Sequence, residues 1–572
     1  MVKNKIFKLF FTFLPQAISV IFINAAAGSA IALLIPWIIK ILIDEVFPNK
    51  NIHQLLHLLV ILALVRIVSG IMLSVNSILT GSVTIKMANK LRGIITEKIN
   101  NLSITALNNE KTGNLMNCIS EDTASFVDIF TNIKDLFSIF VLFISQLIIV
   151  TFIAPKLLIP TIPLLLIYPF LNIFTTRKFR PLSLNYKESI GKLNNFIHEI
   201  ITGNKEIKSF NRQHWQKNRL HFYFNQLHTI YLKYFKALAV SFFSNDILRL
   251  ITDVSIYGCA GYLVIKDYYT AGSAIAAATY INQLINPISY FGESIGWFRN
   301  HFSSWDRIER ILNLENENFE NDGKTEFNAS FKILEFKNVD FSYNKKDKIL
   351  NKINFCIYKN SLVSIVGLSG CGKSTVINLI LKLIRADKGS IRINGQNMYE
   401  IETASFRNRI AVVFQDPFLF DDTIYENIRF GNLEATEEEI KNCAERANIH
   451  EFINSLPEKY LTQIGERGVF LSGGQKQRIG IARALIKKPQ ILILDEATSW
   501  LDFKLEDSMV DLLLDLKKEM TVICVTHRIN SVKHSDQIIL LNAGKIEKTG
   551  SHKELLRTSS LYKDLVYNKI SN

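Results

Sequence analysis

Long apolar segments recur through the first half of this 572-residue chain. Each is close to the ~20 residues that an α-helix needs to cross a hydrocarbon core of ~30 Å. The expected spans are residues 17–43, 56–82, 136–154, 157–175, 240–265 and 273–295. The sequence therefore predicts an all-α transmembrane domain of six helices over residues 1–315.

The connections between these spans differ in length and charge. Residues 86–134 and 176–236 are long, rich in Lys and Arg and helical in pattern, whereas the connection at residues 154–156 is short. Because Lys and Arg are retained on the cytoplasmic side of a membrane, both termini are expected in the cytoplasm, with long cytosolic helical extensions. We expect a multi-pass protein of the bacterial cytoplasmic (inner) membrane, and we assign the net charge of +14 to this asymmetry rather than to nucleic-acid binding.

The chain changes character after the last apolar span. Residues 316–332 are polar and acidic, and we expect them to form a linker. From residue 333 to residue 572, short apolar strands alternate with helices and glycine turns, which is typical of an α/β nucleotide-binding domain. The six cysteines are scattered without a metal-binding spacing, so we interpret them as reduced thiols.

A glycine-rich loop follows an apolar strand at residues 361–366 and precedes an apolar helix. Its sequence, GLSGCGKST, fits the pattern GxxxxGK[ST] in the strand–loop–helix context of a P-loop, or Walker A loop. Lys373 is expected to reach the β- and γ-phosphates of ATP, and the Ser374 hydroxyl to bind Mg²⁺. The predicted ATP-binding residues of the loop are Gly367, Ser369, Gly370, Cys371, Gly372, Lys373, Ser374 and Thr375.

Two adjacent carboxylates follow a second apolar strand, Ile491 to Leu494. Asp495 is placed to hold Mg²⁺ and its waters, and Glu496 is the candidate for polarising the attacking water. Phosphoryl transfer depends on such positioning more than on covalent chemistry. Either carboxylate alone could be a helix cap or a solvated strand end, but their place between ILIL and ATS favours the functional interpretation.

The stretch from Leu471 to Asp502, LSGGQKQRIGIARALIKKPQILILDEATSWLD, resembles the signature and Walker B region of ABC-transporter ATPases. The resemblance covers the whole chain and is to exporters in the membrane half, where residues 107–126 and 199–213 occupy the places of the two coupling segments. In this family, short helices at these places dock on the ATPase domains.

The resemblance implies roles for several further residues. Tyr343 matches the aromatic residue that stacks on adenine, and Gln415 matches the glutamine that senses Mg²⁺ and the membrane domain. Glu466 matches the exporter loop that touches the partner's cytosolic helices, and His527 matches the switch histidine that contacts the γ-phosphate. The implied catalytic residues are Glu496, His527 and Gln415, and the implied metal ligands are Ser374, Gln415 and Asp495.

The signature sequence implies a dimer. In this family the signature closes over ATP held by the other subunit, which here assigns that role to Ser472, Gly474 and Gln475. The chain carries one membrane domain and one ATPase domain, as half-transporters do, and its motif residues are intact. We expect a homodimer, and an unlike partner chain is the alternative. One departure is Trp500, which stands where the family commonly has a small residue.

Ionisable residues near bilayer depth point by default to a transport pathway. Asp246, Arg249 and Asp253 share one helical face at three- and four-residue spacing. Further ionisable residues in or near the spans are Arg66, Glu293 and Arg299. Two interpretations stay open: a set of internal ion pairs, or a mildly acidic cavity wall that favours amphipathic or cationic cargo.

Together these features predict an ABC-type transport ATPase that binds ATP and Mg²⁺. We expect it to export an amphipathic peptide, lipid or drug-like molecule by alternating access, with membrane lipids and the cargo as further partners and no nucleic acid. The alternative is an ATP-gated channel or regulator in which hydrolysis is not coupled to pumping, which the intact Glu496 disfavours. The apolar spans exclude the soluble ABC ATPases of DNA repair and translation.

Overall fold

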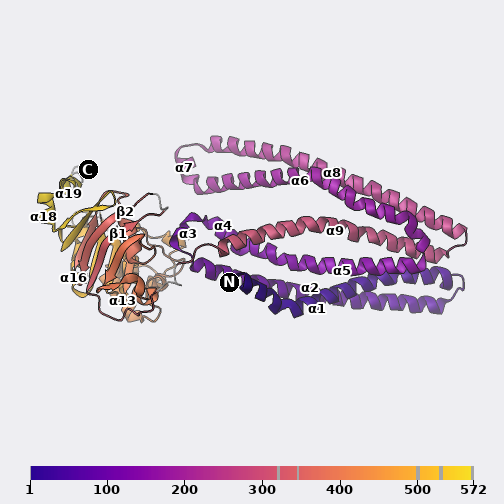
Figure 1. The fold of residues 1–572 in the computed structure, drawn as a ribbon, viewed down its shortest axis with the longest axis horizontal. Helices are drawn as coiled ribbons and strands as arrows, with labels where there is room; N and C mark the ends of the chain where they lie inside the picture. Colours follow the sequence, from indigo (N-terminus) through magenta and orange to yellow (C-terminus); the bar gives the residue numbers. More distant parts are fainter. Residues whose placement is uncertain (1, 318–322, 344–346, 497–502, 527–531, 568–572) are drawn as a thin grey trace. The chain divides into compact units, whose positions relative to one another are not determined.

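The computed structural model describes residues 2–317, 323–343, 347–496, 503–526 and 532–567 (Figure 1). These residues form two compact units. The first, the membrane unit, comprises Met1–Asn100 and Thr112–Asn313, and the second, the nucleotide unit, comprises Asn101–Lys111 and Leu314–Asn572. The predicted fold class, a helical transmembrane domain followed by an α/β domain, is confirmed.

Long helices account for most of the described membrane unit (Figure 1). Each predicted span coincides with part of one of them to within two residues at its ends, and each helix continues beyond its apolar run into neighbouring polar sequence. The helices are α1 (Val2–Ile41), α2 (Ile52–Asn100), α5 (Thr123–Ile153), α6 (Leu158–Thr202), α8 (Gln213–Ile265) and α9 (Ala271–Leu312). The shorter elements are η1 (Leu42–Val46), α4 (Thr112–Asn117), η2 (Cys118–Asp122), η3 (Pro155–Leu157) and α7 (Asn204–Ser209).

Four helical stretches within the described residues are long and apolar enough to cross a membrane. They are Thr12–Val46, Ile52–Asn100, Thr112–Ile153 and Gln213–Ile265. The spans predicted at residues 157–175 and 273–295 lie in α6 and α9, where part of the side chains is outside the described set.

Polar contacts fasten the long helices together, as is common where helices pack in lipid. Helix α1 packs against α2, α5 and α9, and α6 packs against α8. The Asp44 carboxylate, in η1, accepts the backbone N–H of Gly272 at 2.8 Å and so caps the start of α9. A Cβ atom on Gly272 would lie 2.6 Å from the Lys40 carbonyl oxygen, so this approach requires glycine.

Two sheets organise the nucleotide unit. A four-stranded antiparallel sheet has the order β2-β1-β4-β5, and a six-stranded sheet has the order β10-β9-β3-β8-β7-β6. In the larger sheet the strands from β9 to β6 are parallel, and β10 pairs antiparallel at the edge. The strands are β1 (Ile333–Phe341), β2 (Leu350–Tyr358), β3 (Leu362–Val366), β4 (Lys388–Ile393), β5 (Gln396–Asn397), β6 (Ile410–Val413), β7 (Ile491–Asp495), β8 (Thr521–Val525), β9 (Gln537–Asn542) and β10 (Lys545–Gly550).

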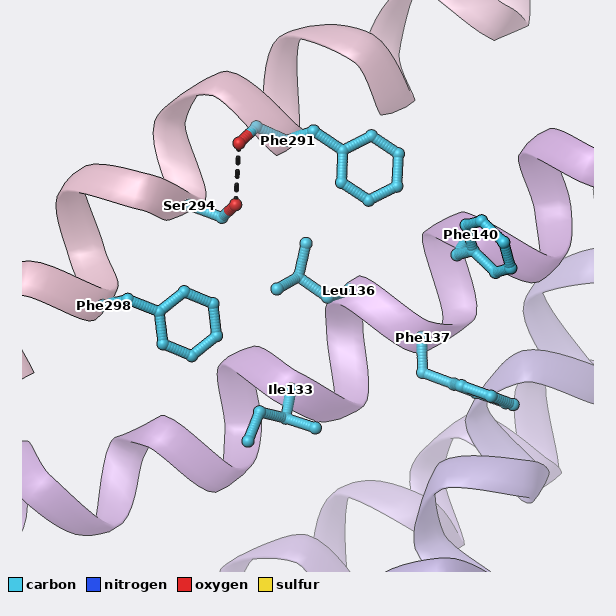
Figure 2. A pocket seen from close by; sticks show the side chains of 7 residues that line it. All are labelled: Ile133, Leu136, Phe137, Phe140, Phe291, Ser294 and Phe298. Atoms are coloured by element: carbon cyan, nitrogen blue, oxygen red, sulfur yellow. Dashed lines mark hydrogen bonds between the residues drawn. The ribbon is translucent and has the colours of Figure 1, made fainter.

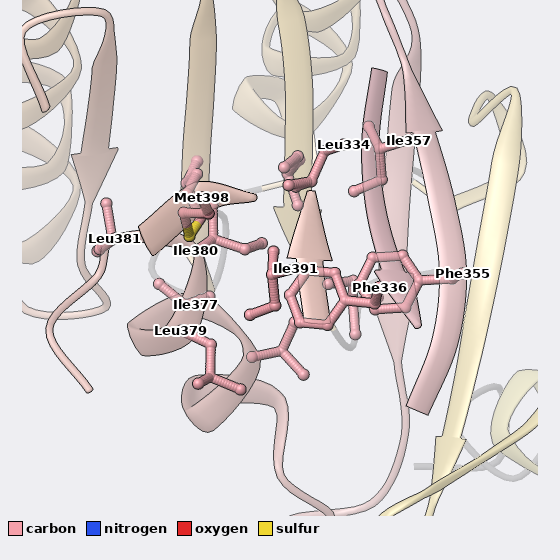
Figure 3. Close-up of a cluster of buried hydrophobic side chains, with 14 of the residues drawn as sticks. Leu334, Phe336, Phe355, Ile357, Ile377, Leu379, Ile380, Leu381, Ile391 and Met398 are labelled. Atoms are coloured by element: carbon pink, nitrogen blue, oxygen red, sulfur yellow. The ribbon is translucent and has the colours of Figure 1, made fainter. Parts of the chain in front are cut away.

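Helix α10 (Lys373–Ile380) and both sheets contribute to one apolar core (Figure 3). Its side chains come from alternate positions of β1 and β2, such as the cross-strand pair Phe336 and Phe355, whose rings stack 4.3 Å apart. Alternation along a strand places every second side chain on the buried face. The core thus fixes α10, and the loop before it, against the ends of the parallel strands.

A second core covers the other part of the parallel sheet. It joins β6, β7 and β8 to α15 (Gly473–Leu485) and α16 (Phe503–Glu519). The smaller helices α12 (Ile424–Arg429), α13 (Glu437–Arg446) and α14 (His450–Ser455) contribute buried side chains to it. The remaining short elements of the unit are α11 (Thr403–Arg407), η5 (Met398–Glu400), η6 (Lys459–Leu461), η7 (Glu466–Gly468), α18 (His552–Thr558) and α19 (Ser560–Tyr567).

One segment belongs to a different unit from its sequence neighbours. Residues 101–111, which contain α3 (Ile104–Asn109), lie with the nucleotide unit although they directly follow α2. The Ser103 N–H donates to the Glu315 carbonyl at 3.1 Å, and the Glu317 N–H donates to the Asn101 carbonyl at 2.8 Å. Glu317 also pairs with Arg407. The residues just before the predicted coupling segment at 107–126 are therefore bonded to the chain that enters the nucleotide unit.

Candidate nucleotide site and membrane pocket

Four of the parallel strands end at one edge of the larger sheet. Neighbouring strands in the order β3-β8-β7-β6 run in the same direction, so the segments that follow them begin side by side. These segments are the Walker A loop after β3, the segment leading to His527 after β8, Glu496 after β7 and Gln415 after β6. Ligands of open α/β sheets bind at this carboxyl edge.

The Walker A loop depends on glycine at close approaches. A Cβ atom on Gly367 would lie 2.1 Å from the Leu541 carbonyl oxygen, and one on Gly372 would lie 2.7 Å from a Leu350 methyl carbon. Gly370 and Gly372 also have positive φ angles, +79° and +108°, which glycine adopts at little cost. Gly372 is the residue before α10, so the loop delivers its amides to a helix N-terminus, where phosphate binds favourably.

The Lys373 side chain lies along the loop rather than in solvent. Its ammonium group donates hydrogen bonds to the carbonyls of Gly367 at 2.9 Å and Leu368 at 3.0 Å, and only 7% of the residue is exposed. Ser369, Gly370 and Ser374 are exposed at the same loop, whereas Cys371 and Thr375 are buried. Burial raises the pKa of the Cys371 thiol, which suits a packing role.

Tyr343 lies close to the same helix. Its hydroxyl is 3.5 Å from the Thr375 hydroxyl, and its ring meets Phe341 edge to face at 4.9 Å. About half of the side chain is exposed. The structure thus places the predicted adenine-stacking residue beside the Walker A helix.

The two carboxylates at the end of β7 differ in environment. The pKa of Asp495 is raised to about 6, mainly by burial and also by the neighbouring Glu496 carboxylate, while Lys373 acts to lower it. Glu496 has a φ angle of +48°, which is uncommon for a residue with a side chain, and its N–H donates to the Val525 carbonyl at 2.7 Å. Backbone strain of this kind gathers at functional sites.

Gln415 is exposed in the segment after β6. Its carbonyl oxygen is 3.4 Å from the side-chain amide nitrogen of Gln477, a residue of α15. The same nitrogen is 3.5 Å from the Glu496 carbonyl oxygen. Gln415 and Glu496 are therefore linked through one buried side chain that the sequence analysis did not single out.

The signature residues form the N-terminus of α15. Ser472 is the N-cap and makes a capping box with Gln475: the Gln475 N–H donates to the Ser472 hydroxyl at 3.3 Å, and the Ser472 N–H donates to the Gln475 side chain at 2.8 Å. Ser472 is exposed and Gly474 is buried. The hydroxyl therefore stands at the open end of a helix of 13 residues.

Two predicted residues, His527 and Trp500, lie outside the described residues. Glu466 is exposed in η7, beside Arg467, which has a φ angle of +52°.

A signal for Gln477 was present in the sequence. Gly474, Gln477 and Ile481 are three and four residues apart and share the buried face of α15, so a polar side chain at the middle position required a partner.

Figure 2 shows an apolar pocket between α5 and α9 in the membrane unit. Its volume is about 530 Å³. Ser294 is the polar member of the lining set, and its hydroxyl already donates to the Phe291 carbonyl at 2.8 Å. The lining residues are Ile133, Leu136, Phe137, Phe140, Phe291, Ser294 and Phe298. A pocket with four aromatic rings and no charged side chain in its lining suits the apolar part of a ligand.

The ionisable residues predicted near bilayer depth lie apart from this lining set. Asp246 and Arg249 are exposed on α8, and Asp253 is half-buried. Within the described part of the chain, no ion pair joins these three side chains. Arg66 is exposed on α2, and the side chains of Glu293 and Arg299 are outside the described set.

Both units match models of known protein families. The ABC transporter transmembrane region matches residues 18–288, and the ABC transporter ATP-binding model matches residues 350–499. The chain is 32% identical over 487 residues to YgaD of Bacillus subtilis (strain 168), with 84% of this chain and 83% of YgaD covered. It is also 32% identical over 548 residues to a protein of Staphylococcus aureus (strain NCTC 8325 / PS 47), with 94% of each chain covered. Both relatives carry the name multidrug export ATP-binding/permease protein.

The fold is similar to that of a solved transporter. A bacterial Atm1-family ABC exporter with ATP bound superposes with a TM-score of 0.80 and 25% sequence identity, covering 98% of this chain and 99% of the other. Similarity of this extent includes the membrane unit as well as the nucleotide unit. The chain therefore belongs to the ABC transporter family, as an exporter-type member that carries its membrane region and its ATPase domain in one polypeptide.

Proposed function

We propose that the protein is an ATP-driven exporter that works as a dimer of two such chains. The observation that carries the proposal is the shared carboxyl edge of β3, β8, β7 and β6, where the Walker A loop, Glu496 and Gln415 begin side by side. A site that handles phosphate is joined here in one chain to helices long and apolar enough to cross a membrane. ATP hydrolysis in such a chain is available to drive movement of a cargo.

The first step is ATP binding. The backbone amides of residues 367–375 and the Lys373 ammonium are suited to the phosphates, and Tyr343 is suited to stack on adenine. Lys373 must then exchange its bonds to the carbonyls of Gly367 and Leu368 for bonds to phosphate oxygens. Because the ammonium is already held at the loop, little side-chain entropy remains to be lost when ATP binds.

The donor set at this edge fits Mg²⁺. The Ser374 hydroxyl, the Asp495 carboxylate and the Gln415 side-chain oxygen are hard oxygen ligands, which Mg²⁺ prefers together with phosphate and water. Burial and the neighbouring Glu496 carboxylate raise the pKa of Asp495, so its charged form is disfavoured there, and a bound cation would stabilise that form. Bound Mg²⁺ would neutralise charge on the phosphates during transfer.

Hydrolysis requires a positioned water. Glu496 is proposed to orient and polarise that water, with His527 at the γ-phosphate and Gln415 adjusting to the occupied site. The fixed backbone of Glu496, tied to Val525, suits a side chain whose position must be exact to a fraction of an ångström. Positioning of this kind contributes more to phosphoryl transfer than covalent chemistry does.

A second chain completes each site. Ser472, Gly474 and Gln475 form the open N-terminus of α15, which is suited to a phosphate but belongs to a different loop from Lys373. We propose that it serves the ATP held by the partner subunit, with two copies of this chain favoured over an unlike pair. Glu466 would then contact the cytosolic helices of the partner.

The membrane unit is proposed to provide the cargo path. The aromatic pocket between α5 and α9 suits the apolar part of an amphipathic drug-like, lipid or peptide cargo (Figure 2). The names of the relatives favour the drug-like class.

We propose that residues 1–315 form the membrane domain, residues 316–332 the linker and residues 333–572 the ATPase domain. The ATPase domain and both termini are placed on the cytoplasmic side of a bacterial inner membrane, in keeping with the basic segments at residues 86–134 and 176–236.

The proposal is tested with the purified full chain in lipid vesicles. ATPase activity is measured with neutral aromatic dyes, cationic dyes, phospholipids and short peptides as additions. The proposal expects Mg²⁺-dependent hydrolysis that at least one of these classes stimulates. The proposal would be overturned if none of these additions changes the rate of ATP hydrolysis and the protein is a monomer in the membrane.

A further inference from the structure

Gln477 is a fully buried polar residue with no assigned role. It belongs to the second turn of α15, and its exposed fraction is 0%. Its side-chain nitrogen lies 3.4 Å from the Gln415 carbonyl oxygen and 3.5 Å from the Glu496 carbonyl oxygen. Both neighbours are acceptors, so only the amide nitrogen can face them. The side-chain oxygen has no hydrogen-bond partner among the described residues.

The helix that carries Gln477 is packed tightly against the same edge of the sheet. A Cβ atom on Gly480 would lie 3.2 Å from Pro417 and 3.3 Å from a Val413 methyl carbon, so α15 lies close to β6 and to the segment that contains Gln415. Apolar side chains of α15 also join β7 in the second core. Gln477 adds a polar link to these apolar contacts, and Arg483 of α15 adds another by donating to the Phe418 carbonyl at 2.7 Å.

The two ends of this link belong to different ATP sites in the proposed dimer. Gln415 and Glu496 serve the ATP held by their own chain. Ser472, five positions before Gln477 in the sequence, caps the helix end that faces the ATP of the partner. Because the buried Gln477 side chain bonds to both carbonyls, a shift of α15 would also move the backbone at Gln415 and Glu496.

We propose that Gln477 is a positioning residue that holds the signature helix and the catalytic edge of the same chain as one body. The inference rests on the proposed function, since it requires the signature of one chain to serve the ATP of another.

The test compares the change Gln477→Met with a matched control, Asn427→Leu, in the full chain in lipid. Asn427 is also a buried amide whose nitrogen donates to two carbonyls, those of Phe420 and Thr423, each at 3.0 Å. Among the described residues, its hydrogen-bond partners do not include Gln415 or Glu496. Methionine is flexible and close to glutamine in length, so it removes the donor with little repacking.

Gln477→Met is expected to lower the kcat of ATP hydrolysis about tenfold, as loss of one or two buried neutral hydrogen bonds implies, with unchanged ATP affinity. Asn427→Leu is expected to lower the melting temperature at least as much but to leave kcat within about twofold. If the two variants lower kcat equally, Gln477 has only a structural role and the inference fails.

The decisive comparison combines each change with Ser472→Ala. If Gln477 connects the signature to the catalytic edge, the double variant Ser472→Ala with Gln477→Met loses less activity than the product of the two single losses. Ser472→Ala with Asn427→Leu should show the simple product. A simple product in both pairs would overturn the inference. Failure of the proposed dimer site can be distinguished from failure of this inference, because Ser472→Ala alone would then leave ATPase activity unchanged.

Discussion

Ser472 and Gln475 cap each other at the start of the signature helix: each backbone N–H is bonded to the side chain of the other, at 2.8 Å and 3.3 Å. The arrangement satisfies two amides that a helix N-terminus otherwise leaves unpaired. It also keeps the Ser472 hydroxyl at the exposed helix end. The same side chain is therefore required for local stability and is available to a phosphate.

Ser472→Ala is predicted to separate these two roles when compared with Ser551→Ala. Ser551 forms an equivalent capping box with Glu554 at α18, outside the proposed site. Each change should lower the free energy of unfolding by about 1 kcal/mol, because each removes one cap. ATPase activity should fall only in Ser472→Ala. Equal activities in the two variants, at equal melting temperatures, would remove Ser472 from the site.

Two glycines of the Walker A loop are predicted to differ in their tolerance of a methyl group. Gly367→Ala places a Cβ atom 2.1 Å from the Leu541 carbonyl oxygen, so the backbone must move, at a cost of about 3 kcal/mol or more. Gly370→Ala meets nothing within 4 Å, and its cost is the strain of a positive φ angle, about 1 kcal/mol. Thermal unfolding of the nucleotide-free protein measures both. A larger loss in Gly370→Ala would contradict the loop geometry.

The pH dependence of Mg²⁺–ATP binding should follow Asp495. Its pKa in the folded protein, about 6, lies above the ordinary value of 3.8, mainly because of burial. The ionised form that Mg²⁺ requires is therefore lost below pH 6, and affinity should be about tenfold weaker at pH 5 than at pH 7. In Asp495→Asn this part of the pH dependence should vanish, while any part due to ATP itself appears in both proteins. Identical pH profiles would contradict the assignment.

The same raised pKa makes the free energy of unfolding depend on pH, in the opposite direction to the binding of Mg²⁺–ATP. The folded nucleotide-free protein holds the Asp495 proton more tightly than the unfolded chain does. Its contribution to stability is therefore greatest below about pH 4 and is lost as the pH rises through about 6. Relative to the wild type, Asp495→Asn should gain stability as the pH rises from 5 to 7. This comparison uses the melting temperatures of the two proteins, measured without nucleotide.

Selectivity for cargo is predicted to depend on the aromatic pocket more than on the acidic residues of α8. Phe291→Ala should weaken the stimulation of ATPase activity by a neutral aromatic dye severalfold, because it removes one wall of the pocket. Phe152→Ala is the matched control, since Phe152 is 84% exposed on α5 and does not line the pocket. Asp246→Asn combined with Asp253→Asn tests the acidic wall. A loss of stimulation by cationic dyes in that variant alone would favour the acidic-wall interpretation.

The sequence predicted those features that local patterns determine. Apolar runs placed each span on one observed helix to within two residues, and the Walker A pattern identified a loop whose glycines are required by contacts and φ angles. Asp495 was recognisable because it forms an adjacent pair with Glu496 between the apolar strand ILIL and the residues ATS. The family resemblance, rather than spacing, supplied Tyr343 and Gln415.

Features that depend on long-range packing were not predicted. The helical pattern of residues 86–134 indicated no break after Asn100, yet residues 101–111 belong to the nucleotide unit, where backbone hydrogen bonds join Asn101 and Ser103 to Glu317 and Glu315. The pocket between α5 and α9 arises from side chains more than a hundred positions apart, which no local pattern connects. Gln477 was missed because its place on the buried face of α15 indicates that it needs a partner, but not which backbone carbonyls supply one.

Hydrolysis at Glu496 is proposed to drive the cargo across the membrane. The most direct measurement is ATP-dependent accumulation of a stimulating dye in sealed vesicles that contain the wild type or Glu496→Gln. The variant should still bind ATP, because Lys373 and the Walker A loop are unchanged. The dye should accumulate against its concentration gradient in vesicles that contain the wild type, and it should not accumulate in vesicles that contain Glu496→Gln. Equal dye movement in both proteins would contradict it, and would identify a channel that ATP opens without pumping.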